Sequence, residues 1–130
     1  MPLWEKLHTK NSLINSMKTK SKDFLPQNEI PWEVCGEGIR RQILGYDPHI
    51  MLVKVEFEAG AVGAVHKHYH SQTTYIVSGK FEVMIDSQKK IMLAGDGYYV
   101  EPDMIHGLSC IEKGIAIDVF TPIRADFLKI

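Results

Sequence analysis

Apolar and polar residues alternate with a period of two along the central part of the chain. Val53, Val55 and Phe57 alternate with charged residues up to Ala59-Gly60, and residues 81–86 repeat the pattern. Successive side chains of a strand point to opposite faces, so this period predicts half-buried strands. Further short apolar segments are separated by turn residues at Ser78-Gly79, Ser87-Gln88-Lys89, Gly95-Asp96-Gly97 and Glu112-Lys113-Gly114. Short strands at this spacing predict an all-β, antiparallel sandwich or barrel.

The first 30 residues differ from the rest because they are locally basic and contain few apolar residues. Pro26 and Pro31 mark the boundary. We therefore divide the 130 residues into an N-terminal extension, 1–30, and one β-domain, 31–130. We expect the extension to be a solvated helix or a loose segment; a nucleic-acid-binding arm is the alternative.

The charge balance excludes several classes of partner. The formal net charge is -1, so we expect no nucleic acid and no anionic membrane surface as partner. The apolar runs are too short to span a bilayer. The first six residues lack the apolar core of a signal peptide, so we expect a cytoplasmic protein.

Histidines are concentrated between residues 66 and 72. His66, His68 and His70 occupy alternating positions, and Gln72 continues the series. On one strand these side chains would share a face. Converging imidazoles favour a transition metal over calcium or magnesium, so the segment predicts a transition-metal site.

The spacing of these residues resembles the two motifs of the cupin superfamily. The first motif is matched by Gly60, His66, His68, Gln72 and Gly79, and the second by Gly95, Asp96, Pro102 and His106. The resemblance implies a single-domain cupin, a small antiparallel β-barrel or jelly roll. It also implies a divalent transition metal held by His66, His68, Gln72 and His106. Such ligands accept nickel, zinc, manganese, cobalt or iron. We expect His70 to support a ligand or to contact the substrate rather than to be a fifth ligand.

Gln72 departs from the usual cupin motif, which has Glu at this position. The amide oxygen of Gln72 can coordinate a metal but carries no charge, so three His and one Gln leave the ion's positive charge uncompensated. This favours Lewis-acid action on an anionic or carbonyl substrate. Iron and oxygen chemistry remains open, since neutral ligand sets also occur there.

The segment 117–128 resembles the closing segment of the KdgF-type pectin-degradation proteins, with further similarity at 40–44 and 59–63. This resemblance covers residues 34–128 and implies ring opening of 4,5-unsaturated monouronates to their linear keto form. It assigns functional roles to Asp118, Phe120 and Arg124.

The residue types suit these roles. Asp118 and Phe120 share one strand face, opposite Ile117 and Val119, which we expect in the core. If the Asp118 face is the barrel interior, Asp118 would be a general base or proton shuttle. The planar fork of Arg124 matches a carboxylate.

Each of the three residues also has a purely structural alternative. Asp118 would pair with Arg40 or Arg41, Arg124 would form a surface salt bridge, and Phe120 would belong to the core.

We therefore expect a metal-dependent, isomerase-like enzyme that opens an unsaturated uronate from pectin or alginate breakdown. The alternatives are a non-catalytic cupin that binds a sugar acid and a metal-dependent oxygenase. The expected partner is a small sugar acid, and family analogy alone predicts a homodimer.

Overall fold

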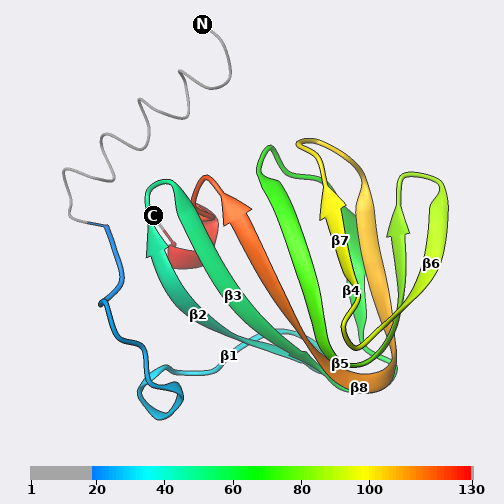
Figure 1. Cartoon of the computed structure of the whole chain (residues 1–130), viewed down its shortest axis with the longest axis horizontal. Helices are drawn as coiled ribbons and strands as arrows, with labels where there is room; N and C mark the ends of the chain where they lie inside the picture. The colour runs from blue at the N-terminus through cyan, green and yellow to red at the C-terminus, as the bar shows by residue number, and fades with distance from the viewer. Residues whose placement is uncertain (1–18, 130) are drawn as a thin grey trace, which may run out of the picture.

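The computed structural model describes residues 19–129 and is built almost entirely of antiparallel strands (Figure 1). Two short 3-10 helices, η1 (Gln27–Glu29) and η2 (Ala125–Leu128), flank the strands. The strands are β1 (Glu33–Gly36), β2 (Ile39–Asp47), β3 (Ile50–Phe57), β4 (Val62–His66), β5 (Ser71–Ile85), β6 (Gln88–Leu93), β7 (Gly97–Val100) and β8 (His106–Thr121). Within residues 19–129, no helix is long and apolar enough to cross a membrane. The predicted all-β class is confirmed.

The long strands β5 and β8 connect the two halves of the fold. The first half of β5 pairs with the end of β8 and with β7, and β8 continues through β3 and β2 to β1. The second half of β5 pairs with the start of β8 and with β6, while β4 pairs with that same part of β8. Figure 1 shows β8 bending at the lower edge of the molecule. The two halves therefore form the two layers of a jelly roll.

Two glycines face each other where β5 and β8 bend. A Cβ on Gly79 would lie 2.6 Å from the Cα of Gly114, and a Cβ on Gly114 would collide with the carbonyl oxygen of Ser78. Gly79 has a φ of +88°, which favours glycine. The predicted turns at Ser78-Gly79 and Glu112–Gly114 are therefore wrong. Both segments lie within continuous strands, and the pairing register shifts between Ile76 and Phe81.

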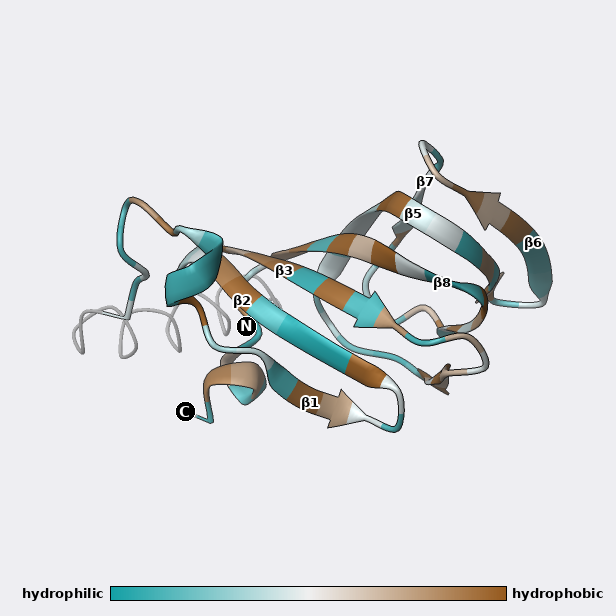
Figure 2. Ribbon diagram, turned by 90° about the horizontal axis from the view of Figure 1, so that it is seen from below, coloured by the Kyte–Doolittle hydropathy of each residue, from teal (hydrophilic) through white to brown (hydrophobic). Residues whose placement is uncertain are grey.

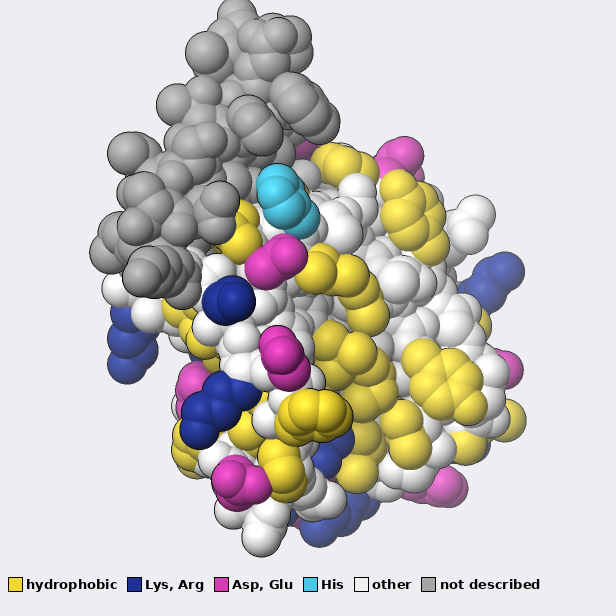
Figure 3. Space-filling view, turned by 60° about the vertical axis from the view of Figure 1, so that its left-hand side comes forward, with side chains coloured by type: hydrophobic (Ala, Val, Ile, Leu, Met, Phe, Trp, Pro, Cys, Tyr) yellow, Lys and Arg dark blue, Asp and Glu magenta, His cyan; other side chains and the backbone are white. Residues whose placement is uncertain are grey.

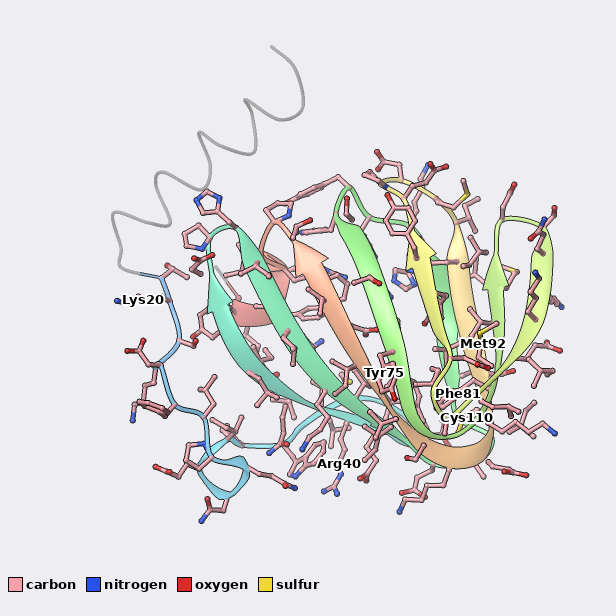
Figure 4. The ribbon with its side chains drawn as sticks, viewed as in Figure 1. Lys20, Arg40, Tyr75, Phe81, Met92 and Cys110 are labelled. Atoms are coloured by element: carbon pink, nitrogen blue, oxygen red, sulfur yellow. The ribbon has the colours of Figure 1, made fainter. Side chains whose placement is uncertain are left out.

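The core lies between the two layers and follows the period-two pattern of the strands. Met51, Val53, Val55 and Phe57 are buried, and Figure 2 shows the alternating hydropathy along β3. In the second layer, Phe81 pairs across strands with Cys110 and with Met92, and Figure 4 shows the three close together. In the first layer, the core positions of β8 are Ala116 and Phe120. Ile117 and Val119 are only half-buried on the other face, so their predicted core positions are wrong.

The segment before β1 is bonded to β2. Gln42 is fully buried, and its Nε2 donates to the carbonyls of Gln27 and Ile30. Ser21 exchanges hydrogen bonds with the backbone of Tyr46. Residues 1–18 of the predicted extension, with most of its basic character, lie outside the described residues. The division at residue 30 stays a prediction.

One face of the molecule carries a band of hydrophobic side chains with charged groups around it (Figure 3). Several large apolar side chains of the β-domain are exposed, among them Tyr75, Val77 and Tyr99. Tyr75 and Val77 lie on β5, and Tyr99 lies on its neighbour β7. The exposed side chains of these strands point away from the core, so they lie on the outer face of the sheet.

Candidate metal centre and its cavity

A cavity of about 220 Å³ lies between the two layers of the jelly roll. Its volume equals that of roughly seven liquid water molecules, which is the scale of a monosaccharide. Its charged lining consists of Arg41, Asp118 and Arg124, and apolar side chains such as Val53, Val55, Phe57 and Phe120 form much of its wall. His66, Gln72 and His106 line it as well. The structure therefore brings most of the predicted site residues to one place.

The three predicted histidine ligands come from two strands and one loop. His66 ends β4 and is paired with His106, the first residue of β8. Directly opposite residues point to the same side of a sheet, so the two rings meet, with centroids 4.5 Å apart. His68 lies in the connection between β4 and β5, and its ring centroid is 4.9 Å from that of His106.

The predicted single strand from His66 to Gln72 is therefore wrong, because β4 ends at His66 and β5 begins at Ser71. The loop between these strands turns the ring of His68 toward those of His66 and His106. Their ligand atoms, one from each residue, all lie within 4.8 Å of one another. Among residues 19–129, this group consists of these three histidines and excludes His70.

Backbone carbonyls fix how the three rings point. Nδ1 of His66 lies 2.7 Å from the Ala64 carbonyl oxygen, and Nδ1 of His106 lies 2.8 Å from that of Met104. His68 Nδ1 faces the carbonyl of His70 at 3.2 Å. A carbonyl oxygen only accepts hydrogen bonds, so each Nδ1 keeps its hydrogen and donates it, and each Nε2 carries the lone pair that a metal needs.

Buried Nε2 of His106 has no hydrogen-bond partner within the described residues. A buried polar atom without a partner is costly, and a bound cation removes that cost. Burial also lowers the pKa of His68, and it lowers that of His106 to about 4, with further contributions from neighbouring charged groups. Neutral imidazoles are the form that binds metal, so these residues fit a divalent transition metal.

Gln72, on β5, lies beside the histidine group, and hydrogen bonds hold its side-chain amide in orientation. Its Oε1 lies 3.0 Å from Nε2 of His68, on the side of the histidine group. Its Nε2 donates to Oγ1 of Thr74 at 3.0 Å and to Oδ1 of Asp118 at 3.4 Å. These acceptors keep the amide oxygen, the atom that can coordinate a metal, directed at the histidines.

Asp118 faces the cavity and is bound by neutral donors. Oγ1 of Thr74, its cross-strand partner, donates to Oδ1 of Asp118 at 2.6 Å. Burial raises the pKa of Asp118 to about 6, while the Thr74 hydrogen bond and the charge of Arg124 act in the opposite direction. Neither alternative pairing of Asp118 is observed: Arg40 bonds to Glu56, and Arg41 faces Glu33.

Arg124 and Phe120 form the wall of the cavity next to Asp118. The Arg124 side chain is only 12% exposed, and its Nε and Nη2 donate to both carboxylate oxygens of Asp126. Its guanidinium carbon lies 5.0 Å from the centre of the Phe120 ring and 4.1 Å from that of Phe127. Phe120 is both a core residue and a cavity residue, since its ring also contacts His68 edge-on at 5.7 Å.

His70 lies next to His68 but belongs neither to the histidine group nor to the cavity lining. Its ring is buried, stacks on Tyr69 with centroids 4.0 Å apart, and bonds through Nε2 to the carbonyl of Ile123. Burial, with the nearby charge of Arg124, lowers the pKa of His70 to about 4. This histidine thus joins the connection that carries His68 to the segment that carries Arg124.

Thr74 was not predicted as a site residue. It alternates with Gln72 and therefore shares its strand face, which is the signal by which the sequence could have identified it. Thr74 is 3% exposed and joins a candidate metal ligand to the candidate base.

A jelly roll with this histidine group between its layers is the architecture of a cupin. The sequence model of the cupin domain matches residues 53–120, and the chain belongs to this family.

Several relatives are similar over nearly their whole length. The pectin degradation protein KdgF of Dickeya dadantii (strain 3937) is 44% identical over 107 residues, which make up 81% of this chain and 97% of that protein. The structure of KdgF from Halomonas sp. superposes with a TM-score of 0.78 at 35% identity, covering 82% of this chain and 99% of that one. An RmlC-like cupin from Shewanella frigidimarina NCIMB 400 gives a TM-score of 0.81 at 42% identity, with 83% and 97% covered. The chain is thus a KdgF-like cupin.

Proposed function

We propose that this protein catalyses the opening of cyclic 4,5-unsaturated monouronates to their linear keto form. The observation that carries the proposal is that Asp118 and Arg124 line one monosaccharide-sized cavity together with His66 and His106, two members of the histidine group. The similarity to pectin-degradation proteins supports a uronate as substrate.

Asp118 is the residue proposed to move the proton. Its carboxylate accepts the proton of the C1 hydroxyl, and the C1–O5 bond then breaks to give an aldehyde at C1. The electron pair of that bond makes O5, C5 and C4 an enolate. Return of the proton to C4 gives the ketone at C5, so the reaction is an isomerisation with no net gain or loss of atoms. A carboxyl pKa of about 6 suits a group that accepts and then returns a proton near neutral pH.

Arg124 and Phe120 are proposed to position the substrate. Arg124 carries a permanent charge and retains Nη1 outside its bonds to Asp126, so it can bind the substrate carboxylate. Phe120 supplies an apolar wall for the sugar ring. A divalent transition metal held by His66, His68, Gln72 and His106 would supply Lewis-acid stabilisation of negative charge on a substrate oxygen.

The test follows the loss of ultraviolet absorbance of the conjugated double bond. The wild type, Asp118→Asn and the chelated wild type are compared against the uncatalysed rate. We expect Asp118→Asn to lower kcat by about 10²- to 10⁴-fold, the range of general acid–base catalysis. If neither Asp118→Asn nor chelation slows the reaction while the fold stays intact, the proposal fails.

The same preparation distinguishes the alternative functions. Uronate binding without turnover would indicate a binding cupin, and oxygen consumption with a uronate would indicate an oxygenase. The identity of the metal follows from elemental analysis of the purified protein. The homodimer and the cytoplasmic location stay predictions, and light scattering of the full chain tests the first.

A further inference from the structure

Arg41 is a second cation in the cavity lining, and it comes from β2 rather than from β8, which carries Asp118. It lies on β2 beside Ile39, two residues away on the same strand face, and both line the cavity. Its cross-strand partner Val55 also lines the cavity. The Arg41 side chain is 18% exposed, so a permanent charge is largely withdrawn from solvent here.

Arg41 and Arg124 share one aromatic neighbour. The guanidinium carbon of Arg41 lies 3.9 Å from the centre of the Phe127 ring, and that of Arg124 lies 4.1 Å from it. The two guanidinium carbons are therefore no more than about 8 Å apart. Like charges at that separation repel each other, and an anion bound near both would relieve that repulsion. The cavity lining contains one carboxylate, Asp118, against these two cations.

The two arginines differ in how well their N–H groups are hydrogen-bonded to carboxylates. Arg124 makes two short bonds to Asp126, at 3.0 and 2.9 Å. For Arg41 the nearest carboxylate is that of Glu33, whose Oε2 lies 3.5 Å from both Nε and Nη2. Charge-assisted hydrogen bonds are normally about 2.7–2.9 Å long. Nε of Arg41 is buried and forms no hydrogen bond within the described residues.

We propose that Arg41 binds the carboxylate of the sugar acid through its under-used donors, together with Arg124. This inference rests on the proposed function for the identity of the acid. Asp126 and Phe127 hold Arg124 in place, while Arg41 supplies a planar fork that a carboxylate can engage with two hydrogen bonds. Arg41 thereby makes the cavity selective for acids over neutral sugars.

The neighbouring Arg40 is a matched control. It lies on the opposite face of β2, where its Nε donates to Glu56 at 2.9 Å and its guanidinium stacks over Trp32 at 4.1 Å. Figure 4 shows Arg40 at the lower edge of the molecule, and the cavity lining does not include it. Arg40→Gln removes the same charge from the same strand without changing the cavity.

The experiment compares Arg41→Gln, Arg41→Lys and Arg40→Gln in the full-length, metal-loaded protein. Turnover of the unsaturated monouronate gives KM and kcat, and calorimetry gives the affinity for galacturonate and for galactose. Loss of hydrogen bonds to a charged group predicts that Arg41→Gln raises KM by about 10- to 100-fold and leaves kcat within about threefold. The KM of Arg41→Lys should lie between those of Arg41→Gln and the wild type, and the KM of Arg40→Gln should match that of the wild type.

The preference for galacturonate over galactose separates binding from a purely structural role. We expect Arg41→Gln to lose that preference. The inference is overturned if Arg41→Gln keeps the wild-type KM, or if its affinity for both sugars falls equally. If Arg41→Gln does not fold, KM and the preference for galacturonate over galactose are compared between Arg41→Lys and the wild type instead.

The outcome for the wild type tests the proposed function separately. If the wild type binds galacturonate but does not turn over the monouronate, the proposed reaction fails, and a lost acid preference in Arg41→Gln still supports Arg41. If the wild type binds neither acid, both proposals fail.

Discussion

Replacing Gln72 with Glu tests the electrostatic relation between the metal centre and Asp118. The substitution puts an oxygen in place of Nε2, which lies 3.4 Å from Oδ1 of Asp118 and 3.0 Å from Oγ1 of Thr74. Two unit charges 3.4 Å apart repel by about 5 kcal/mol at an effective dielectric constant of about 20, and by about half that at about 40. The two hydrogen bonds lost from Nε2 add about 0.5–1.5 kcal/mol each.

We therefore expect chelator-treated Gln72→Glu to be less stable than chelator-treated wild type by about 3 kcal/mol or more at pH 8. Repulsion raises the pKa of the folded carboxyl pair above that of the unfolded chain. The folded state then binds more protons, so stability falls as pH rises. The stability difference between Gln72→Glu and the wild type should consequently be small near pH 5 and largest at pH 8. Urea unfolding followed by intrinsic fluorescence at both pH values measures it.

The double variant Gln72→Glu with Asp118→Asn is the control. It removes the second charge, so it should recover most of the lost stability, and the double-mutant cycle gives the coupling energy. The metal-loaded Gln72→Glu protein should show a smaller deficit, because a bound cation compensates the added charge. A deficit that is independent of pH, or that persists unchanged in the Asp118→Asn background, would refute the charge-pair reasoning.

Three further predictions concern the fold and the metal. Gly114→Ala should destabilise the protein by about 3 kcal/mol in urea unfolding, because the added Cβ would collide with the Ser78 carbonyl. Gly45→Ala is the control and should cost far less stability, because the atom nearest to its added Cβ is 3.7 Å away. Thr74→Val should weaken metal affinity by about 10- to 100-fold in a competitive chelator titration, because the Gln72 amide loses the hydroxyl that orients it. An unchanged metal affinity would contradict this prediction. Metal at about 100 times its Kd should stabilise the chelated protein by about 2.7 kcal/mol, seen as a higher melting temperature, and magnesium should not replace it.

The period-two pattern predicted the strands well, because burial on one face forces alternation whatever the tertiary arrangement. It could not distinguish a turn from a bend within a strand. Gly79 favours a positive φ in either case, and only its packing against Gly114 decides between them. The ligand set shows the same limit: spacing brought His66, His68 and His106 together as candidates, while a loop, rather than one strand, orients His68.

Contacts between distant segments were beyond prediction from local patterns. The hydrogen bond between His70 Nε2 and the Ile123 carbonyl joins residues 53 positions apart in the sequence, and the position of Arg41 near Phe127 depends on where η2 docks. Alternation with Ile39 and Ile43 could have placed Arg41 on the inner face. A lone arginine among apolar neighbours on one strand face is therefore an informative signal, since burying its charge is costly without an anionic partner.

The charge at position 72 on β5 affects the protonation of Asp118 on β8, because the two side chains are in contact. Two carboxylates 3.4 Å apart cannot both stay ionised, so a Glu at position 72 would leave one of them protonated at neutral pH in the absence of a metal. A neutral amide avoids that competition: its oxygen faces the histidines, and its nitrogen donates to Asp118. A Gln in place of Glu would therefore keep the proposed base beside the candidate metal centre in the ionised form that proton abstraction requires. A metal held by these residues would then have no anionic protein ligand, so the ion's charge would be available to the proposed uronate substrate.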